Sequence, residues 1–264
     1  MRALLGRGAP GPAARDVTVF RDDLFLVSYP RSGNTWLRFL LANALRPGET
    51  VTFGAMARLV PDVYDEPDAA LRKRPRPRAL KSHEPYDPRY PSVLYLVRNP
   101  VDVAVSYYHY LIKMRVLDEG FDLNRFVEAF VEGSLDGFGP WGDHVTGWLD
   151  AREGDERFSW QRYEDLLGDA SAGVREMLRL LGVARDDEQV RAAVARSSAD
   201  ELRRLERETA AELPTFRGSR PDKPFIRAAR VGAGAEELSP ELVARITEAW
   251  APVAERVGYS LTPS

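Results

Sequence analysis

The sequence predicts an α/β fold in which a central parallel sheet is flanked by helices. Short apolar runs, typical of buried strands, alternate with longer stretches in which apolar residues recur at helical spacing. Two of these runs pass through a short polar turn directly into a helical stretch. Strands that alternate with helices in this way are typical of a parallel sheet with helical crossovers.

The predicted strands span residues 24–28, 79–81, 93–97 and 158–163. The predicted helices lie near 34–45, 100–113, 122–132 and 142–151, and the later part of the chain is mostly helical. Two stretches, 46–78 and 114–141, break the alternation. The first ends in the basic run 72–78, for which a solvated loop is favoured over a binding patch.

Size and composition are those of an enzyme-sized domain. The chain of 264 residues can bury a large core as one domain over 17–264, after a flexible tail over 1–16 that is rich in Gly, Ala, Pro and Arg. No apolar run is long enough to cross a bilayer or to form a signal-peptide core. The absence of cysteine excludes disulfides and thiolate sites, no metal site is predicted, and a cytoplasmic location is expected. A net charge of −3 argues against nucleic acid as a partner.

The first strand ends in a polar turn that favours anion binding. Pro30 and Gly33 mark the turn, and apolar residues then recur at helical spacing, at Leu37, Leu40, Leu41 and Leu45. Free N–H groups at the start of a helix, with the helix dipole behind them, attract anions. Arg31 adds a charge, and Asn34 and Thr35 can add side-chain donors. An ordinary capped strand-turn-helix connection has the same pattern, and the motif of nucleotide-triphosphate P-loops is absent.

Few residues can serve as an imidazole base, because the chain has three histidines. His83 follows a predicted strand, at the end where sites of parallel sheets gather. His109 is expected to pack or to lie on the surface, and no role is assigned to His144.

Three motifs resemble those of one enzyme family, in the family's order. Residues 29–36, Tyr-Pro-Arg-Ser-Gly-Asn-Thr-Trp, resemble the 5'-phosphosulfate loop (Tyr-Pro-Lys-Ser-Gly-Thr-Thr-Trp) of sulfotransferases that use 3'-phosphoadenosine 5'-phosphosulfate (PAPS). Residues 97–109 are similar to the family's 3'-phosphate segment, and 79–83 stand where the family carries Lys-Thr-His. The resemblance implies a P-loop-NTPase-like three-layer fold. It also implies transfer of a sulfuryl group from PAPS to a hydroxyl of a small-molecule, lipid or glycan acceptor.

The resemblance implies roles for individual residues. His83 would take the proton of the acceptor hydroxyl, Lys81 would contact the sulfuryl group or acceptor, and Arg31 would replace the family's loop lysine near the bridging oxygen. A guanidinium can stabilise charge there but does not readily donate a proton. The residues expected to bind the cofactor are Arg31, Ser32, Gly33, Asn34, Thr35, Trp36, Arg98, Ser106, Tyr163, Ser197, Arg227, Arg230 and Gly232.

The last motif departs from the family pattern. In residues 225–235, Arg227 and Gly232 match Phe-x-Arg-Lys-Gly-x-x-Gly, whereas Ala228 and Ala229 replace its Lys-Gly. Arg230 is expected to take the place of the lysine. The family's dimer motif is unrecognisable in 235–244, which leaves the oligomeric state open.

Two alternatives stay open at this point. One is a nucleotide kinase on a related fold, and the other is a PAP-binding protein without turnover, which the alanines at 228, 229 and 233 suggest. The acceptor is not predicted, because pocket walls vary freely on one fold.

Overall fold

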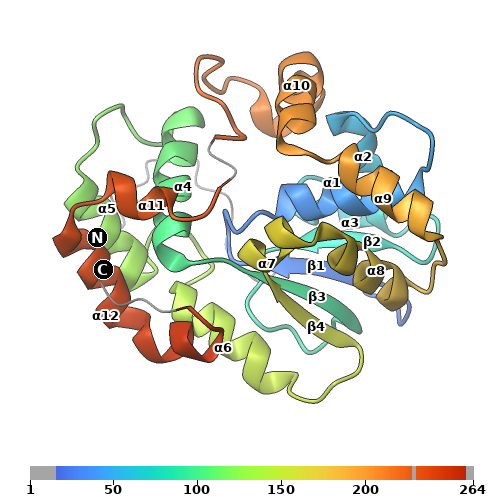
Figure 1. The fold of residues 1–264 in the computed structure, drawn as a ribbon, viewed down its shortest axis with the longest axis horizontal. Helices are drawn as coiled ribbons and strands as arrows, with labels where there is room; N and C mark the ends of the chain where they lie inside the picture. Colours follow the sequence, from blue (N-terminus) through green and yellow to red (C-terminus); the bar gives the residue numbers. More distant parts are fainter. Residues whose placement is uncertain (1–15, 228–229, 260–264) are drawn as a thin grey trace.

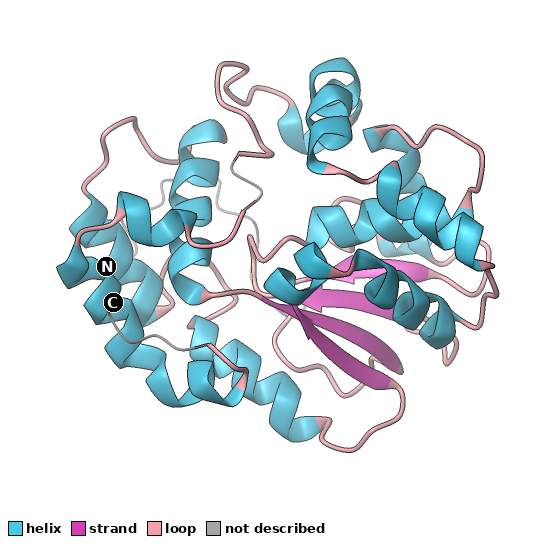
Figure 2. Cartoon of the chain, viewed as in Figure 1, coloured by secondary structure: helices cyan, strands magenta, loops and turns pink. Residues whose placement is uncertain are grey.

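The computed structural model describes residues 16–227 and 230–259. A four-stranded sheet forms its centre, in the order β2-β1-β3-β4, and every pair of neighbouring strands is parallel. The predicted parallel sheet with flanking helices is therefore confirmed (Figure 2). The strands are β1 (Leu24–Ser28), β2 (Ala79–Ser82), β3 (Ser92–Val97) and β4 (Phe158–Arg162). The predicted fourth strand was one residue too long, because Tyr163 begins a helix.

The sheet separates two hydrophobic cores, since successive residues of a strand point to opposite faces. In β1, Leu24 and Leu26 pack into one core, whereas Phe25 and Val27 pack into the other. All five residues of β1 are buried, which explains why its first four residues, 24–27, form a continuous apolar run.

Helices cover both faces of the sheet (Figure 1). The core containing Leu24 and Leu26 is formed with α1 (Asn34–Leu45), α2 (Phe53–Leu59), α7 (Tyr163–Gly168), α8 (Ala170–Leu181), α9 (Asp187–Ala195) and α10 (Ala199–Thr209). The opposite core is formed with α4 (Pro100–Lys113), α5 (Leu123–Glu132), α6 (Trp141–Ala151) and α12 (Pro240–Arg256). Shorter elements are α3 (Asp68–Leu71), α11 (Ala233–Glu237), η1 (Ala210–Glu212) and η2 (Pro214–Phe216). None of the helices in the described part of the chain is long and apolar enough to span a membrane.

The basic run 72–78 differs in part from the solvated loop that was predicted. Arg72 and Lys73 are exposed, but Arg78 is 2% exposed and forms a buried ion pair with Asp23. The run therefore ends as part of the core, where Arg78 also donates hydrogen bonds to the carbonyl oxygens of Thr18 and Leu71. The predicted tail 1–16 lies outside the described residues except for Asp16.

Candidate active site

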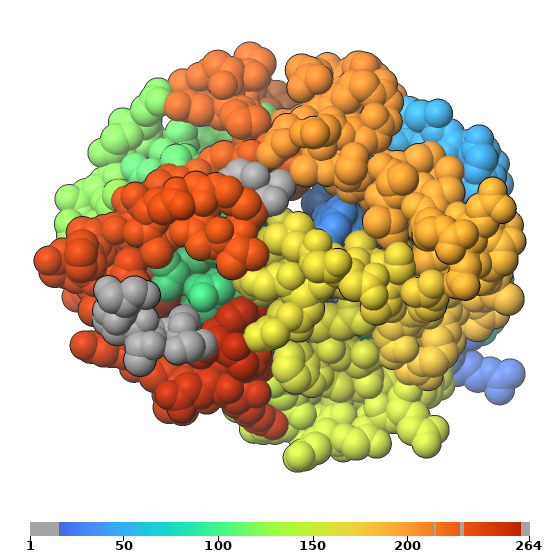
Figure 3. All heavy atoms as spheres, viewed as in Figure 1, coloured from blue at the N-terminus to red at the C-terminus, as the bar shows by residue number. Residues whose placement is uncertain are grey.

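A cavity of about 690 Å³ opens at the carboxyl edge of the sheet. It is lined by residues that follow each of the four strands: Arg31 after β1, His83 after β2, Arg98 after β3 and Tyr163 after β4. In the space-filling view, the molecule is hollowed between the yellow segment around α7 and the orange segment around α10 (Figure 3). The site predicted from the first three motifs thus lies in one place.

The turn between β1 and α1 is built to hold an anion. Gly33 caps α1 with a φ of 103°, no side chain caps this end, and the first turn contains no acidic residue. In the described part of the chain, the N–H groups of Gly33, Asn34 and Thr35 have no acceptor. A Cβ at position 33 would lie 2.6 Å from the ring of Tyr163, so a larger residue is excluded by space as well as by φ. These N–H groups form the kind of concavity that binds phosphate or sulfate oxygens.

Two polar side chains of this turn, Asn34 and Ser32, differ in whether they are free to bind a ligand. The amide nitrogen of Asn34 donates to the Leu26 carbonyl at 3.0 Å and to the Ser28 hydroxyl at 3.2 Å. Both of its amide hydrogens are used, so the expected side-chain donor is corrected to a backbone N–H. The hydroxyl of Ser32 is buried and has no partner among the described residues, which leaves it free for a ligand oxygen.

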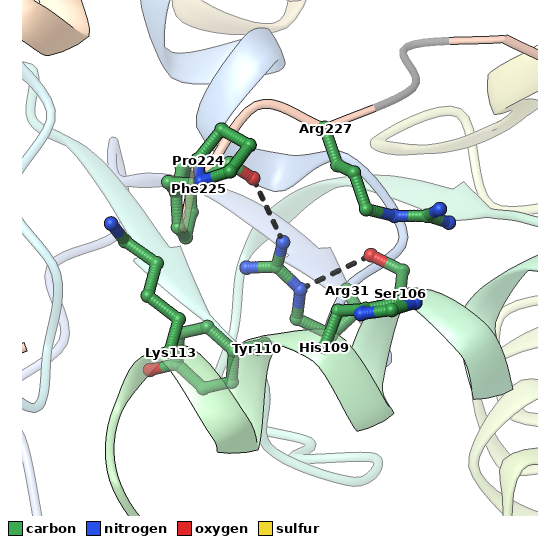
Figure 4. A pocket seen from close by; sticks show the side chains of 8 residues that line it. All are labelled: Arg31, Ser106, His109, Tyr110, Lys113, Pro224, Phe225 and Arg227. Carbon is green, nitrogen blue, oxygen red and sulfur yellow. Dashed lines mark hydrogen bonds between the residues drawn. The ribbon is translucent and has the colours of Figure 1, made fainter. Parts of the chain in front are cut away.

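Arg31 extends from the turn toward α4 and residues 224–227 (Figure 4). Its Nε lies 3.3 Å from the Ser106 hydroxyl, and an Nη donates to the Phe225 carbonyl at 3.4 Å. The guanidinium lies between the rings of Tyr110 and Phe225, at 4.6 and 4.4 Å from their centres. Burial lowers the pKa of Arg31 to about 10, so it is charged at neutral pH.

Arg98 is a second cation that lines the cavity. It is 8% exposed, its guanidinium lies 4.5 Å over the ring of Tyr163, and its buried Nε has no partner in the part of the chain that the structure describes. An Nη lies 3.8 Å from Oδ2 of Asp102. This Oδ2 also accepts from the Gly232 N–H, and Oδ1 of Asp102 accepts from the Gly234 N–H. A buried cation with an unpartnered Nε next to an open helix start favours a polyanionic ligand.

The expected cofactor contacts of Trp36, Tyr163 and Ser197, which the family resemblance implies for adenine, are partly corrected. Trp36 and Tyr163 line the cavity, with their rings edge to face at 5.6 Å. The indole N–H of Trp36 donates to the Ser197 carbonyl at 2.9 Å. The Ser197 hydroxyl is fully buried, donates to the Ala193 carbonyl and accepts from the Asn43 amide. The Ser197 N–H also donates to the Val194 carbonyl at 3.0 Å, so this geometry does not support a ligand contact through the hydroxyl or the N–H.

His83 is held so that one ring nitrogen is ready to accept a proton. Its Nδ1 lies 2.7 Å from the Ser28 carbonyl oxygen. Because a carbonyl oxygen only accepts, Nδ1 must carry the hydrogen, and Nε2 of the neutral ring is then an acceptor. Burial, followed by the nearby Lys81 charge, lowers the pKa of His83 well below its usual value. The ring is therefore neutral at neutral pH.

Two residues that the sequence analysis did not assign hold the backbone of His83. The His83 N–H donates to the Tyr64 hydroxyl at 3.0 Å, and His144 Nε2 donates to the His83 carbonyl at 2.9 Å. The Tyr95 hydroxyl lies 2.8 Å from His144 Nδ1 and donates to it. No local motif surrounds Tyr64 or His144, so only the fold brings them to the base.

Lys81 is paired in this structure. Its ammonium donates to a carboxylate oxygen of Asp62 at 2.7 Å, and both side chains line the cavity. Asp62 comes from the stretch 46–78 and was missed, because no motif marks it. Burial lowers the pKa of Lys81, and the Asp62 charge opposes this shift.

The C-terminal motif is divided between the cavity and the surface. Arg227 lines the cavity and pairs with Glu237. Arg230 is exposed, pairs with Glu236 and lies outside the cavity, so its expected role as the replacement for the family's lysine has no support from this geometry. Gly232 contacts Asp102, as described above, and Ala228 and Ala229 lie outside the described residues.

The sequence matches a family model described as a sulfotransferase domain over residues 21–258. It is 32% identical to sulfotransferase 2B1 of Rattus norvegicus over 67% of this chain and 54% of that protein. It is 27% identical to sulfotransferase 1B1 of Mus musculus over 80% of this chain and 75% of that protein. The match therefore spans about half the length of the rat relative and three quarters of the mouse relative.

Solved structures with the same fold include a retinol dehydratase in complex with androsterone and the inactive cofactor PAP. That structure has a TM-score of 0.76 and 20% identity, covering 92% of this chain and 84% of its own. Mouse sulfotransferase SULT7A1 complexed with PAP has a TM-score of 0.69 and 24% identity, covering 95% of this chain and 88% of its own.

Proposed function

Since this chain belongs to the PAPS-dependent sulfotransferase family, we propose that it transfers a sulfuryl group to an acceptor hydroxyl with His83 as the general base. The predictions of family, enzyme class and sulfuryl donor are confirmed by the match to the family model and to named sulfotransferases. The predicted P-loop-NTPase-like fold is confirmed by the fold shared with solved sulfotransferases. The kinase alternative is thereby set aside.

The observation that carries the proposed mechanism is the tautomer of His83. The Ser28 carbonyl holds the hydrogen on Nδ1, which leaves Nε2 as the acceptor in a cavity that also contains the anion-binding turn. PAPS supplies a sulfuryl group on a phosphate that can leave. As the acceptor oxygen forms a bond to sulfur and the bond from sulfur to the phosphate oxygen breaks, Nε2 takes the hydroxyl proton and PAP departs.

The residues around the turn fit such a donor. The open N–H groups of Gly33, Asn34 and Thr35 suit the 5' end, and the unpartnered hydroxyl of Ser32 adds a donor. Arg98, with its unpartnered buried Nε, suits the 3'-phosphate that distinguishes PAPS from ATP. Arg31 places positive charge at the cavity wall, which favours a transition state that develops charge on the leaving oxygen, and Lys81 can contribute there once it leaves Asp62.

The acceptor is proposed to be a small molecule with a hydroxyl group. Two of the similar solved proteins hold androsterone or retinol, and both of these are small molecules with a hydroxyl group. A single domain over 17–264 and a cytoplasmic location stay predictions.

A transfer assay with radiolabelled PAPS tests the proposal. The wild-type protein should label a nitrophenol, and His83→Ala should lower turnover by about 10² to 10⁴ while PAP affinity is unchanged. A protein that binds PAP but labels no acceptor would establish the alternative of a PAP-binding protein without turnover. Full turnover of an aliphatic alcohol by His83→Ala would refute the base assignment alone.

A further inference from the structure

Arg38 is a buried cation at the cavity that has no part in the transfer described above. It follows the anion-binding turn by about one helical turn of α1, is 5% exposed and lines the cavity. Its Nε donates to the Val60 carbonyl at 2.9 Å, and this is its one hydrogen bond within the described residues. Its buried Nη2 has no partner there. Unpaired donors on a buried guanidinium are costly, so these nitrogens point to oxygen atoms of a ligand.

Asp65 lines the same cavity and carries the opposite charge. One carboxylate oxygen accepts from the Thr215 hydroxyl at 3.1 Å, and no cation of the described chain lies within ion-pair distance of it. Asp62, in contrast, is neutralised by Lys81. Burial lowers the pKa of Arg38, and the charges of Asp62 and Asp65 oppose that shift.

These groups lie on the acceptor side of the cavity. Asp62 pairs with Lys81 on β2, and Tyr64, between Asp62 and Asp65 in the sequence, holds the backbone of His83. The expected cofactor contacts at Tyr163 and Ser197 come instead from α7 and the segment after α9. A ligand that meets Arg38 and Asp65 is therefore on the side of the base.

The pair of opposite charges selects among polar groups. An ammonium group would satisfy Asp65 but would be repelled by Arg38. A carboxylate would satisfy Arg38 but would be repelled by Asp65. A hydroxyl can donate to a carboxylate and accept from a guanidinium, so several neutral hydroxyls satisfy both. Flat aromatic walls complete the cavity on this side, formed by Tyr64, Tyr110, Phe138 and Phe216.

We propose that this side of the cavity is a subsite for a neutral polyhydroxylated acceptor, a sugar or cyclitol ring, whose oxygens bind Arg38 and whose hydroxyls bind Asp65. The inference rests on the proposed sulfotransferase function and names the class of its acceptor.

The test compares acceptors of similar ring size: cyclohexanol, glucose, glucosamine and glucuronate. Labelled PAPS gives kcat/KM for each, and calorimetry on the PAP complex gives binding without turnover. We expect kcat/KM and the affinity for the PAP complex each to be higher for glucose than for cyclohexanol by about tenfold or more. A hydrogen bond to a charged group contributes a free energy of that size. Both quantities should also be higher for glucose than for glucosamine and glucuronate.

Variants then assign the effect to residues. Arg38→Met and Asp65→Asn should each lower the glucose-to-cyclohexanol ratio by about tenfold or more. PAP affinity should be unchanged. Arg185→Met is the matched control, because Arg185 also donates to carbonyl oxygens of α1, at Ala44 and Leu45, but lies outside the cavity. If Arg38→Met does not fold, the test uses Arg38→Lys and Asp65→Asn instead, because Asp65 is more exposed than Arg38.

Several outcomes overturn the proposal. Preference for glucuronate or glucosamine would mean that one charge of the pair dominates. A change in PAP affinity with Arg38→Met, at an unchanged acceptor ratio, would move Arg38 to the donor site. Transfer to a nitrophenol without transfer to glucose would refute the acceptor class while the sulfotransferase function stands, whereas no transfer to any acceptor would refute that function.

Discussion

Replacement of the buried His144 should change how stability depends on pH. Burial lowers the pKa of His144 from 6.5 to about 4. Between these values the unfolded chain binds a proton at this position and the folded protein does not, so stability is lost as the pH falls below 6.5. At about pH 4.5, two units below 6.5, the loss amounts to about 2.5 kcal/mol of the free energy of unfolding.

His144→Gln removes the titration but keeps a donor toward the His83 carbonyl. At neutral pH the variant should be less stable by about 1–3 kcal/mol, because the buried Tyr95 hydroxyl loses its acceptor. As the pH falls, the wild-type protein loses stability that the variant retains. The difference between the two should therefore shrink or change sign near pH 4.5.

Urea unfolding at several pH values between about 7 and 4.5 measures this difference. Carboxyl groups titrate in both proteins and cancel when the two are subtracted. A difference in free energy that is constant across this range would refute the reasoning, since it would mean that His144 has the same pKa in the folded and unfolded protein.

Three further predictions concern the proposed site. Arg98→Ala should weaken PAP binding in calorimetry by about tenfold or more, as expected when a charge-assisted hydrogen bond is lost, and should barely affect ATP; equal losses for both ligands would contradict a 3'-phosphate role. The acidic limb of the pH profile of kcat/KM should lie well below pH 6.5, because the base must be neutral and burial lowers the pKa of His83; a limb near 6.5 would assign the base elsewhere. The double change Ala228→Lys with Ala229→Gly restores the family pattern and should tighten PAP binding or leave it unchanged, and a severe loss in calorimetry would show that the segment binds differently.

The strands and helices near the motifs could be predicted closely, because their side chains carry strong local patterns. The strand at 24–28 and the helices at 34–45 and 100–113 agree with the structure to the residue. Each strand begins or ends at a polar turn, and β1 and β3 are buried at every position and mostly apolar because both faces are covered.

What could not be predicted depends on contacts between distant segments. The ion pair of Arg78 with Asp23, the carboxylate of Asp62 beside Lys81 and the contact of His144 with His83 each join residues far apart in the sequence. The side chains of Asn34 and Ser197 match family positions, yet neighbouring groups in this fold already use their hydrogen bonds.

The ring of Tyr163 contacts both parts of the anion-binding site, the turn after β1 and the side chain of Arg98. It packs against Gly33 in the turn after β1 on one side, and the guanidinium of Arg98 lies over it. A ligand that orders the turn therefore also restricts the surface on which Arg98 rests. Binding at the two phosphate positions should be cooperative, so that a nucleotide with both groups binds more tightly than the sum of its halves implies. Such cooperativity would let the protein reject ATP, which lacks the 3'-phosphate, without any side chain that repels it.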